Sequence, residues 1–251
     1  TLGRDATVKH IVVTLGGDVV RILPSVDYTG PGGAAEMIGL YFAGPGEHAE
    51  HRLFVDHSVG HCRSNVLYKG ALNGDGAHTV WVGDVLIRAA AVGTDTYEMN
   101  RNLVLSGGGR ADSVPNLEIE TGEIVGAGHA STTGRFDDEQ LFYLMSRGVP
   151  ADEARRLVLR GFFEDLLATI GVPQIDEVVR DTLLPVLAQN PNALDWETPQ
   201  TTDSIVTSFT KAVRTRLGNR RANAVPDLAT RQTLGDPKLT LWCELVLAAA
   251  D

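Results

Sequence analysis

The residue whose type and setting most favour chemistry is His129, a single imidazole within the stretch GAGHASTTG, residues 126–134. Glycine, alanine, serine and threonine surround it, and their small side chains leave both ring nitrogens reachable from outside. An imidazole with an unperturbed pKa of about 6.5 can bind a metal or transfer a proton near neutral pH. His129 is therefore a candidate ligand, and the alternative is a purely structural histidine.

A second group of residues with metal-binding side chains lies upstream, within a histidine-rich tract. On a β-strand, residues an odd number of positions apart face opposite sides, so two such histidines do not converge unless a turn separates them. We expect structural roles for this tract, with an iron or zinc site as the alternative. Its members are His48, His51, Asp56, His57, His61 and Cys62.

The remaining motifs indicate no enzyme mechanism. The glycine-rich segment SGGGRAD, residues 106–112, lacks the Lys-Ser/Thr pair and the following helix of a phosphate-binding loop. No serine-nucleophile elbow and no HExxH motif is present, and the two cysteines, Cys62 and Cys243, have no paired-ligand spacing.

Composition bears on the compartment and on the class of partner. The chain of 251 residues has a formal net charge of -10, which repels a phosphate backbone and argues against nucleic-acid binding. No apolar run approaches the roughly 20 residues of a membrane span. The polar start TLGRDATVKH has no methionine, so we expect a fragment or a processed chain. It has no secretory-signal pattern, and the two cysteines indicate no disulfide framework, so we expect a cytoplasmic protein.

The elements that must position His129 are strands. From residue 6 to about residue 133, short runs of alternating or β-branched residues are separated by glycine-rich turns, as in TVKHIVVTL and EMIGLYFA. A period of two residues interrupted by Gly-Gly, Pro-Gly or Asn-Gly is typical of β-structure. The pattern is compatible with a sandwich, a barrel or a solenoid.

Helices are expected after residue 136. Asp137 or Asp138 can cap the first helix, DDEQLFYLMSRG, and Gly148 can end it in a left-handed conformation. VPADEARRLVLRGFFEDLLATIG and QIDEVVRDTLL predict a second and a third helix, each with an apolar face.

Residues 189–251 differ in composition from the rest of the chain. Of the 27 glycines, 25 precede residue 189, and so does the whole net negative charge. TTDSIVTSFTKAVRTRLG indicates a helix, whereas KLTLWCELVLAAA is compatible with a strand or a buried helix. We expect an unassigned, mainly helical extension.

The chain closely resembles the SufB/SufD family of iron-sulfur cluster assembly proteins in NRNLVLSGGGRADSVPNLEIETGEIVGAGHASTTGRFDDEQLFYLMSRGV, residues 100–149, followed by EARRLVLRGFF. SNVLYKGAL and HTVWVGDVLIRAAAVGTDTYE resemble the family in the same way. The resemblance covers about residues 1–188, is greatest to the SufD branch, particularly an actinobacterial type, and does not extend to residues 189–251.

The resemblance implies a mainly β fold: a right-handed parallel β-helix over residues 1–136, then a small C-terminal α-helical domain over residues 137–188. It also implies a non-enzymatic scaffold subunit of the SUF system. The β-helix would pair with a SufB-like subunit, or form a homodimer when that subunit is absent. His129 would lie at the junction and contribute to a transient iron-sulfur cluster shared with SufB, with no cofactor held tightly by the chain alone.

The helical domain would dock a SufC-like ATPase. The candidate docking residues are Asp137, Asp138, Glu139, Gln140, Leu141, Phe142, Tyr143, Arg147, Phe162 and Phe163.

Two departures favour the SufD branch over SufB: Ala130 stands where SufB has a glutamate, and Asn100 aligns near a SufB cysteine. Two other functions remain open. The first is a polysaccharide-active β-helix enzyme, which needs carboxylates clustered on one exposed face. The second is a SufD-like body that carries an unrelated interaction module. The candidate carboxylates for the enzyme are Asp95, Glu98, Glu118, Glu120 and Glu123.

Overall fold

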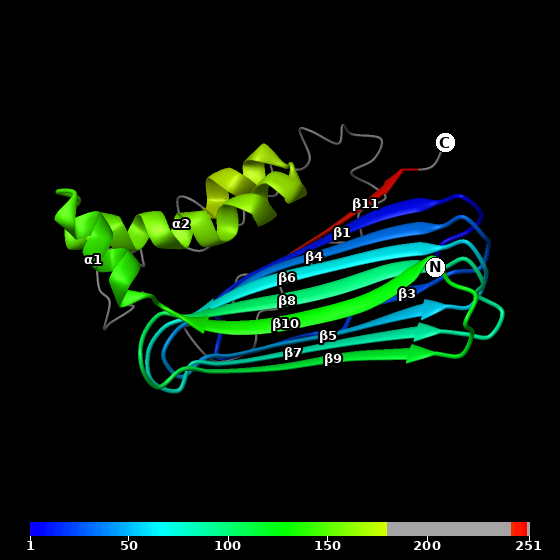
Figure 1. Cartoon of the computed structure of the whole chain (residues 1–251), viewed down its shortest axis with the longest axis horizontal. Coiled ribbons are helices and arrows are strands. Elements are labelled where there is room, and N and C mark those ends of the chain that lie inside the picture. Colours follow the sequence, from blue (N-terminus) through cyan, green and yellow to red (C-terminus); the bar gives the residue numbers. More distant parts are fainter. Residues whose placement is uncertain (180–241, 250–251) are drawn as a thin grey trace, which may run out of the picture.

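The chain winds between two mainly parallel β-sheets, and its longer helix lies against the outer face of one of them. The structure is a computed structural model, and it describes residues 1–179 and 242–249. The strands form a β-solenoid of about four turns. Figure 1 shows the two sheets face to face, with the helices beside the upper sheet. The predicted parallel β-helix followed by a few helices is confirmed.

The six-stranded sheet has the order β10-β8-β6-β4-β1-β11, and neighbouring strands are parallel except for β1 and β11. Its strands are β1 (Thr7–Leu15), β4 (Ala34–Ala43), β6 (Arg63–Leu72), β8 (Asp95–Val104), β10 (Gly126–Arg135) and β11 (Trp242–Ala249).

The five-stranded sheet has the order β2-β5-β7-β9, with β3 paired to β5. All of its described pairs are parallel. Its strands are β2 (Val19–Ile22), β3 (Ser25–Asp27), β5 (His48–His57), β7 (His78–Ile87) and β9 (Arg110–Ile119).

In-register stacking sets the interior of the solenoid. Each strand lies directly beside its counterpart in the next turn, so that Met37 faces Val66 and Val66 faces Glu98. Alternate residues of a strand point to opposite faces, so every second side chain enters the interior. Large side chains such as Trp81 and Tyr28 are fully buried there. The sequence period of two therefore corresponds to an inward and an outward face.

Two glycines make room for tyrosine rings between the same pair of strands. Gly39 on β4 lies opposite Tyr68 on β6, and Gly70 on β6 lies opposite Tyr41 on β4. A Cβ atom on either glycine would overlap the facing ring. Tyr41 in turn stacks on His51 with ring centroids 4.9 Å apart. These close approaches require glycine because any larger side chain would displace an aromatic ring from the core.

Helices begin directly after β10. Asp137 caps α1 (Asp138–Ser146) by accepting hydrogen bonds from the backbone N–H groups of Glu139 and Gln140, and Gly148 has a φ of 87°. Both features confirm the sequence prediction. The longer α2 (Ala151–Ile170) ends at Gly171, whose φ is 65°. Residues 173–179 are also helical, and the rest of the predicted third helix lies outside the described residues.

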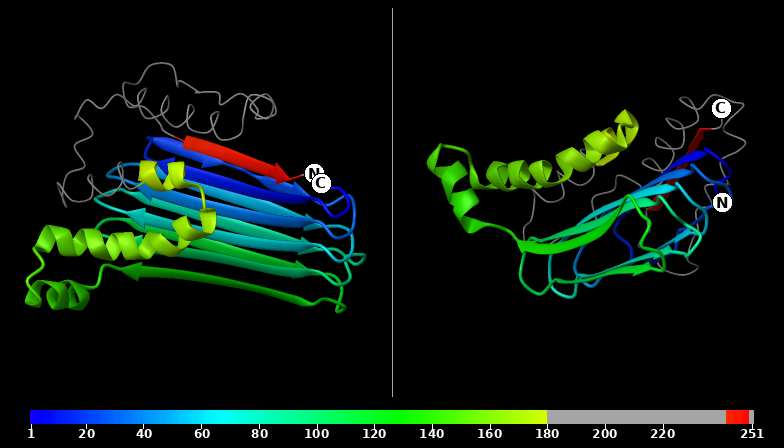
Figure 2. Two further views of the ribbon diagram at one scale, coloured as in Figure 1. Left: turned by 90° about the horizontal axis from the view of Figure 1, so that it is seen from above. Right: turned by 45° about the vertical axis from the view of Figure 1, so that its right-hand side comes forward.

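Helix α2 shares one hydrophobic core with the solenoid. It crosses the outer face of the six-stranded sheet (Figure 2). Within this contact the buried Lys69 donates to the carbonyl oxygen of Phe162 at 2.8 Å and forms an ion pair with Asp165. The helical segment therefore does not fold as a separate layer. The core residues of the helical segment are Leu159, Phe163, Leu166, Leu167, Ile170, Val172, Ile175 and Val179, and those of the sheet are Ile11, Val13, Leu15, Ile38, Leu40, Phe42, Ala71 and Leu103.

Within KLTLWCELVLAAA, whose sequence is compatible with a strand or a buried helix, Trp242–Ala249 form a strand, β11. This strand pairs antiparallel with β1 along the full length of the segment. An unpaired strand edge presents a row of backbone N–H and C=O groups, and pairing with β1 satisfies those of the added segment. The predicted helix TTDSIVTSFTKAVRTRLG lies outside the described residues. No helix in the described part of the chain has both the length and the hydropathy needed to cross a membrane.

A Gly39→Ala substitution should lower the free energy of unfolding by about 2 kcal/mol, because the added methyl group overpacks the core against Tyr68. Urea unfolding followed by circular dichroism measures this change. Gly134→Ala on β10 is the matched control, since an added Cβ there meets only a backbone oxygen at 4.0 Å. Equal stability of the two variants would contradict the packing.

Candidate functional site

His129 lies in the middle of β10, at one end of the strand order of the six-stranded sheet. It is in register with Glu98 on β8, and its Nδ1 atom is 3.7 Å from Oε1 of Glu98. The His129 side chain is 44% exposed, whereas that of Glu98 is 1% exposed. In-register neighbours point to the same face, so the imidazole lies over the open end of the solenoid interior. One side of the ring thus meets solvent, and the other meets a buried carboxyl group.

Glu98, which lies beside His129, is a buried carboxyl group. Neither of its carboxyl oxygens has a hydrogen-bond partner among the described residues. Burial raises the pKa of Glu98 to about 8, and the negative charge of Asp84 contributes to the shift. At neutral pH the group is therefore mainly protonated. Its unused hydrogen-bonding capacity lies directly beside the imidazole.

A hydrogen-bonded polar network begins further along the strand that carries Glu98, and it reaches across the interior to β4 and β9. Tyr41 Oη donates to Oδ1 of Asn102 at 2.5 Å, and Asn102 Nδ2 donates to Oδ1 of Asn100 at 2.8 Å. Ser113, on the facing sheet, donates to Oδ1 of Asn100 at 2.6 Å. The interior near the open end is thus polar and internally satisfied around these residues.

The arrangement can supply one ligand, but it does not enclose a metal by itself. Among the described residues, no group of three or more His, Cys, Asp or Glu side chains is placed to hold a metal ion. A half-exposed imidazole at an open strand edge can serve as one ligand of a site completed by another molecule. The small neighbours Gly128 and Ala130 leave room for such an approach.

The histidine-rich tract does not converge on one point. His51 and His57 both enter the interior, where His51 contacts Oγ1 of Thr14 at 3.0 Å and His57 contacts Oγ of Ser64 at 2.9 Å. Burial lowers the pKa of His51 to about 3 and that of His57 to about 4, so both rings are neutral at physiological pH. These contacts with core side chains favour a structural role for the two histidines over a metal site.

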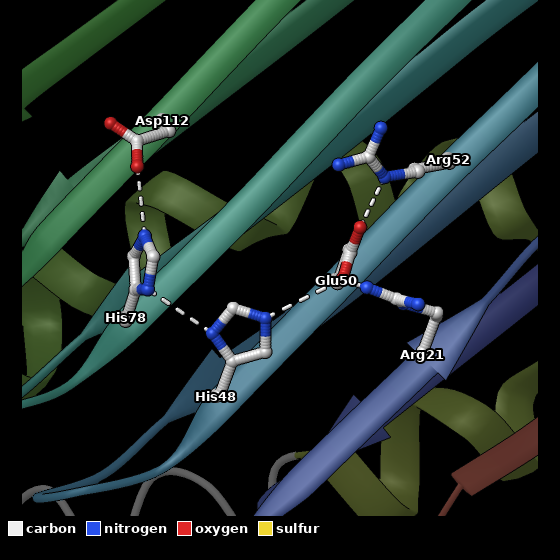
Figure 3. A network of polar contacts seen from close by, with 6 residues as sticks. All are labelled: Arg21, His48, Glu50, Arg52, His78 and Asp112. Atoms are coloured by element: carbon white, nitrogen blue, oxygen red, sulfur yellow. Dashed lines mark hydrogen bonds and ion pairs between the residues drawn. The ribbon is translucent and has the colours of Figure 1, made fainter.

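The other members of the tract lie elsewhere. His48 is on the outer face of the five-stranded sheet, beside His78 (Figure 3). His61 lies in the turn before β6, with a φ of 60°, and Cys62 of the same turn is fully buried. Sequence reasoning passed over His78 because it is 30 residues from His48, although the two are neighbours in the sheet.

The docking candidates divide into an exposed and a buried group. Glu139, Gln140, Phe142, Tyr143 and Arg147 on and after α1 are exposed, with Phe142 at 73%. The Arg147 guanidinium lies over the ring of Tyr143, 5.3 Å from its centroid.

The other group is less accessible. Leu141 and Phe162 are half-buried, and Phe163 is 1% exposed, in the core between α2 and the six-stranded sheet. A partner cannot reach Phe163 while α2 lies on the sheet, so this residue does not belong to a docking surface. Asp137 caps α1, and Asp138 is its first residue.

The carboxylates that a polysaccharide-active site would need are not brought to one exposed face. Glu98 is buried on β8 in the six-stranded sheet, whereas Glu118 is on β9 in the five-stranded sheet. Glu120 accepts a hydrogen bond from the backbone N–H of Ala89 at 3.0 Å. Asp95 is the first residue of β8, and Glu123 lies in the loop before β10. This arrangement does not support the carbohydrate hypothesis.

Comparison with known proteins agrees with the resemblance seen in the sequence. Residues 1–162 match the family model described as "SUF system FeS cluster assembly, SufBD core domain". An iron-sulfur cluster assembly SufBD family protein of Mycobacterium tuberculosis is 66% identical over 182 residues, which cover 70% of this chain and 46% of that protein.

Two further relatives are similar over nearly the same length. A SufBD family protein of Mycobacterium leprae is 65% identical over 182 residues, covering 70% of this chain and 46% of the relative. The iron-sulfur cluster assembly protein SufD of Escherichia coli is 30% identical over 188 residues, covering 75% of this chain and 43% of the relative. The chain therefore spans less than half the length of these curated relatives.

A Glu98→Gln substitution should make folding stability less dependent on pH. The folded-state pKa of Glu98, about 8, lies above the ordinary value of 4.5, so the folded state binds this proton more tightly than the unfolded state. The wild type must then lose stability as the pH rises from 4.5 to 8, by on the order of 3 kcal/mol. The Glu98→Gln variant lacks this loss, and its stability relative to the wild type should increase over the same range.

Urea unfolding at several pH values between about 5 and 9 measures the difference. Glu118→Gln, at an exposed position on the other sheet, is the control and should leave the pH dependence unchanged. Parallel pH profiles of wild type and Glu98→Gln would show that the carboxyl group is not perturbed.

Proposed function

The chain belongs to the SufBD family of the SUF iron-sulfur cluster assembly system, and from this premise we propose that it is a non-enzymatic scaffold subunit on which a cluster forms at a junction with a SufB-like partner. The observation that carries the proposal is the position of His129. It is half-exposed on β10 at the open end of the solenoid, where a second molecule can approach it.

The geometry of this end suits a junction between two solenoids. Strands β10 and β9 end the strand orders of their sheets among the described residues, and each is 10 residues long. Long strand edges present backbone N–H and C=O groups that an added strand can pair with. A SufB-like solenoid docked here would cover the open interior and bring its own side chains close to His129.

A cluster site shared between this chain and a partner fits the ligands that the chain provides. His129 provides one imidazole, and the described residues provide no set of three metal-binding side chains around it. A transient iron-sulfur cluster would then take its remaining ligands from the partner, so that neither subunit retains it alone. In the partner's absence, the same edges of two copies of this chain would form a homodimer.

The exposed aromatic residues of α1 are the proposed contact for a SufC-like ATPase. Phe142 and Tyr143 project from a short helix that lies beyond the edge of the sheets (Figure 1). Neighbouring exposed aromatic side chains mark interaction sites more often than single exposed apolar residues do. Because α1 follows β10 after only Phe136 and Asp137, a movement imposed on α1 would reach the strand that carries His129. The cytoplasm remains the expected compartment.

Replacing His129 with alanine should leave folding and assembly unchanged and lower the yield of cluster by about tenfold or more, since one ligand of the shared site is lost. The measurement is anaerobic co-expression with the SufB-like and SufC-like proteins of the same source, followed by iron and sulfide analysis of the purified complex. His61→Ala, at an exposed turn position, is the control. A normal cluster content in the His129→Ala complex would refute the ligand role.

Replacing Phe142 with serine should weaken binding of the SufC-like ATPase by about 30-fold, the effect of removing an aromatic anchor worth roughly 2 kcal/mol. Titration calorimetry with the purified ATPase measures the affinity. Val19→Ser is the matched control, because Val19 is 72% exposed, close to the 73% of Phe142, but lies on β2. Equal loss of affinity in both variants would contradict a docking surface on α1.

A further inference from the structure

A pair of histidines on the outer face of the five-stranded sheet has a geometry that the proposed scaffold role does not explain. His48 on β5 and His78 on β7 are in register, and their Nδ1 atoms are 3.1 Å apart (Figure 3). Both side chains are about one-third exposed. They are neighbours only because adjacent turns of the solenoid stack, and they lie on the opposite sheet from His129.

Each imidazole has a carboxylate behind it. Nε2 of His78 donates to Oδ2 of Asp112 at 2.8 Å. Nε2 of His48 is 3.6 Å from Oε2 of Glu50. In metal sites, a ligating histidine usually directs its second ring nitrogen to a carboxylate or carbonyl group, which fixes the tautomer and orients the ring. Asp112 and Glu50 stand in this relation to the two histidines.

The carboxylates determine what the facing nitrogens can do. The hydrogen bond to Asp112 places the His78 proton on Nε2, so Nδ1 of His78 carries a lone pair. Without a metal, His48 satisfies that lone pair by donating its own Nδ1–H. If the His48 proton moves to Nε2, where it faces Glu50, both Nδ1 lone pairs become available to one cation.

The distance between the nitrogens fits two ligands of a single ion. Zinc–imidazole bonds are about 2.0–2.1 Å long, and two such ligands at a tetrahedral angle place their nitrogens about 3.3 Å apart. The observed separation of 3.1 Å is close to this value, and each ring must turn so that its Nδ1 lone pair points to the ion instead of to the facing nitrogen. Coordination would thus replace the present contact without rearranging the sheet.

We propose that His48 and His78 form a surface site for a borderline divalent transition metal ion of the Zn²⁺, Ni²⁺ or Cu²⁺ class. Imidazole suits these ions, and Cu²⁺ should bind most tightly. Arg21 and Arg52 contact Glu50, and Arg110 contacts Asp112, so the carboxylates are largely neutralised. The site therefore binds a cation by coordination and not by net charge, with water or a partner's side chain as the remaining ligands.

The test is isothermal titration of the purified chain with Zn²⁺, together with electron paramagnetic resonance of the Cu²⁺-loaded protein. All variants carry His129→Ala, so that the proposed cluster ligand does not contribute and the outcome is independent of the scaffold role. We expect one equivalent of metal and nitrogen hyperfine coupling from two imidazoles. His48→Gln and His78→Gln should each weaken binding at least tenfold.

Two further variants distinguish a built site from general surface binding. Asp112→Asn should weaken the affinity by about 10- to 100-fold, the usual effect of losing a carboxylate behind a ligating histidine. His61→Gln, which changes an exposed histidine in a turn, should leave it unchanged. Circular dichroism checks that each variant is folded. Absence of binding in the parent chain, or equal binding in the His48→Gln and His78→Gln variants, would overturn the proposal and leave a hydrogen-bonded pair.

Discussion

In-register stacking of successive turns is the constraint that organises this structure. Each inward side chain must fit against the residue at the same position of the next turn, because the parallel strands pair without offset. Tyrosine rings fit over Gly39 and Gly70, and buried histidines find partners in Thr14 and Ser64. Where stacking ends, no described strand covers the last face of the final turn. His129 occupies that turn, and its unusual setting follows from the absence of a described strand beyond β10.

The interior near the open end is more polar than a packed core requires. Glu98 is buried without a hydrogen-bond partner among the described residues, although isolated carboxyl groups are costly to bury. Neutralisation by a raised pKa reduces this cost, and a docked second solenoid would change the surroundings of Glu98 and His129 together. Folding stability and the proposed junction are therefore linked through the same pair of residues.

The outer faces of the two sheets serve different roles. The six-stranded sheet buries its outer face against α2, and Lys69 secures the contact through Phe162 and Asp165. The outer face of the five-stranded sheet has no described helix over it, and its charged residues pair with one another along the turns. One face thus connects the helices to the strands, while the other leaves the His48–His78 pair accessible.

Signals local to the chain were enough to define most elements and the family. Alternating residues and glycine-rich turns predict the strands, and Asp137 and Gly148 predict the bounds of α1. The sequence segment around His129 identifies the family. Each of these signals depends on residues close together in the chain. Which face of each strand points inward required the folded structure, since a period of two fits either choice. The pairing of His129 with Glu98 and of His48 with His78 also required it, because stacking joins residues about 30 positions apart. The structure also decides the conformation of Trp242–Ala249, whose local pattern is compatible with a strand or a helix. This segment is a strand because it pairs with the edge of β1.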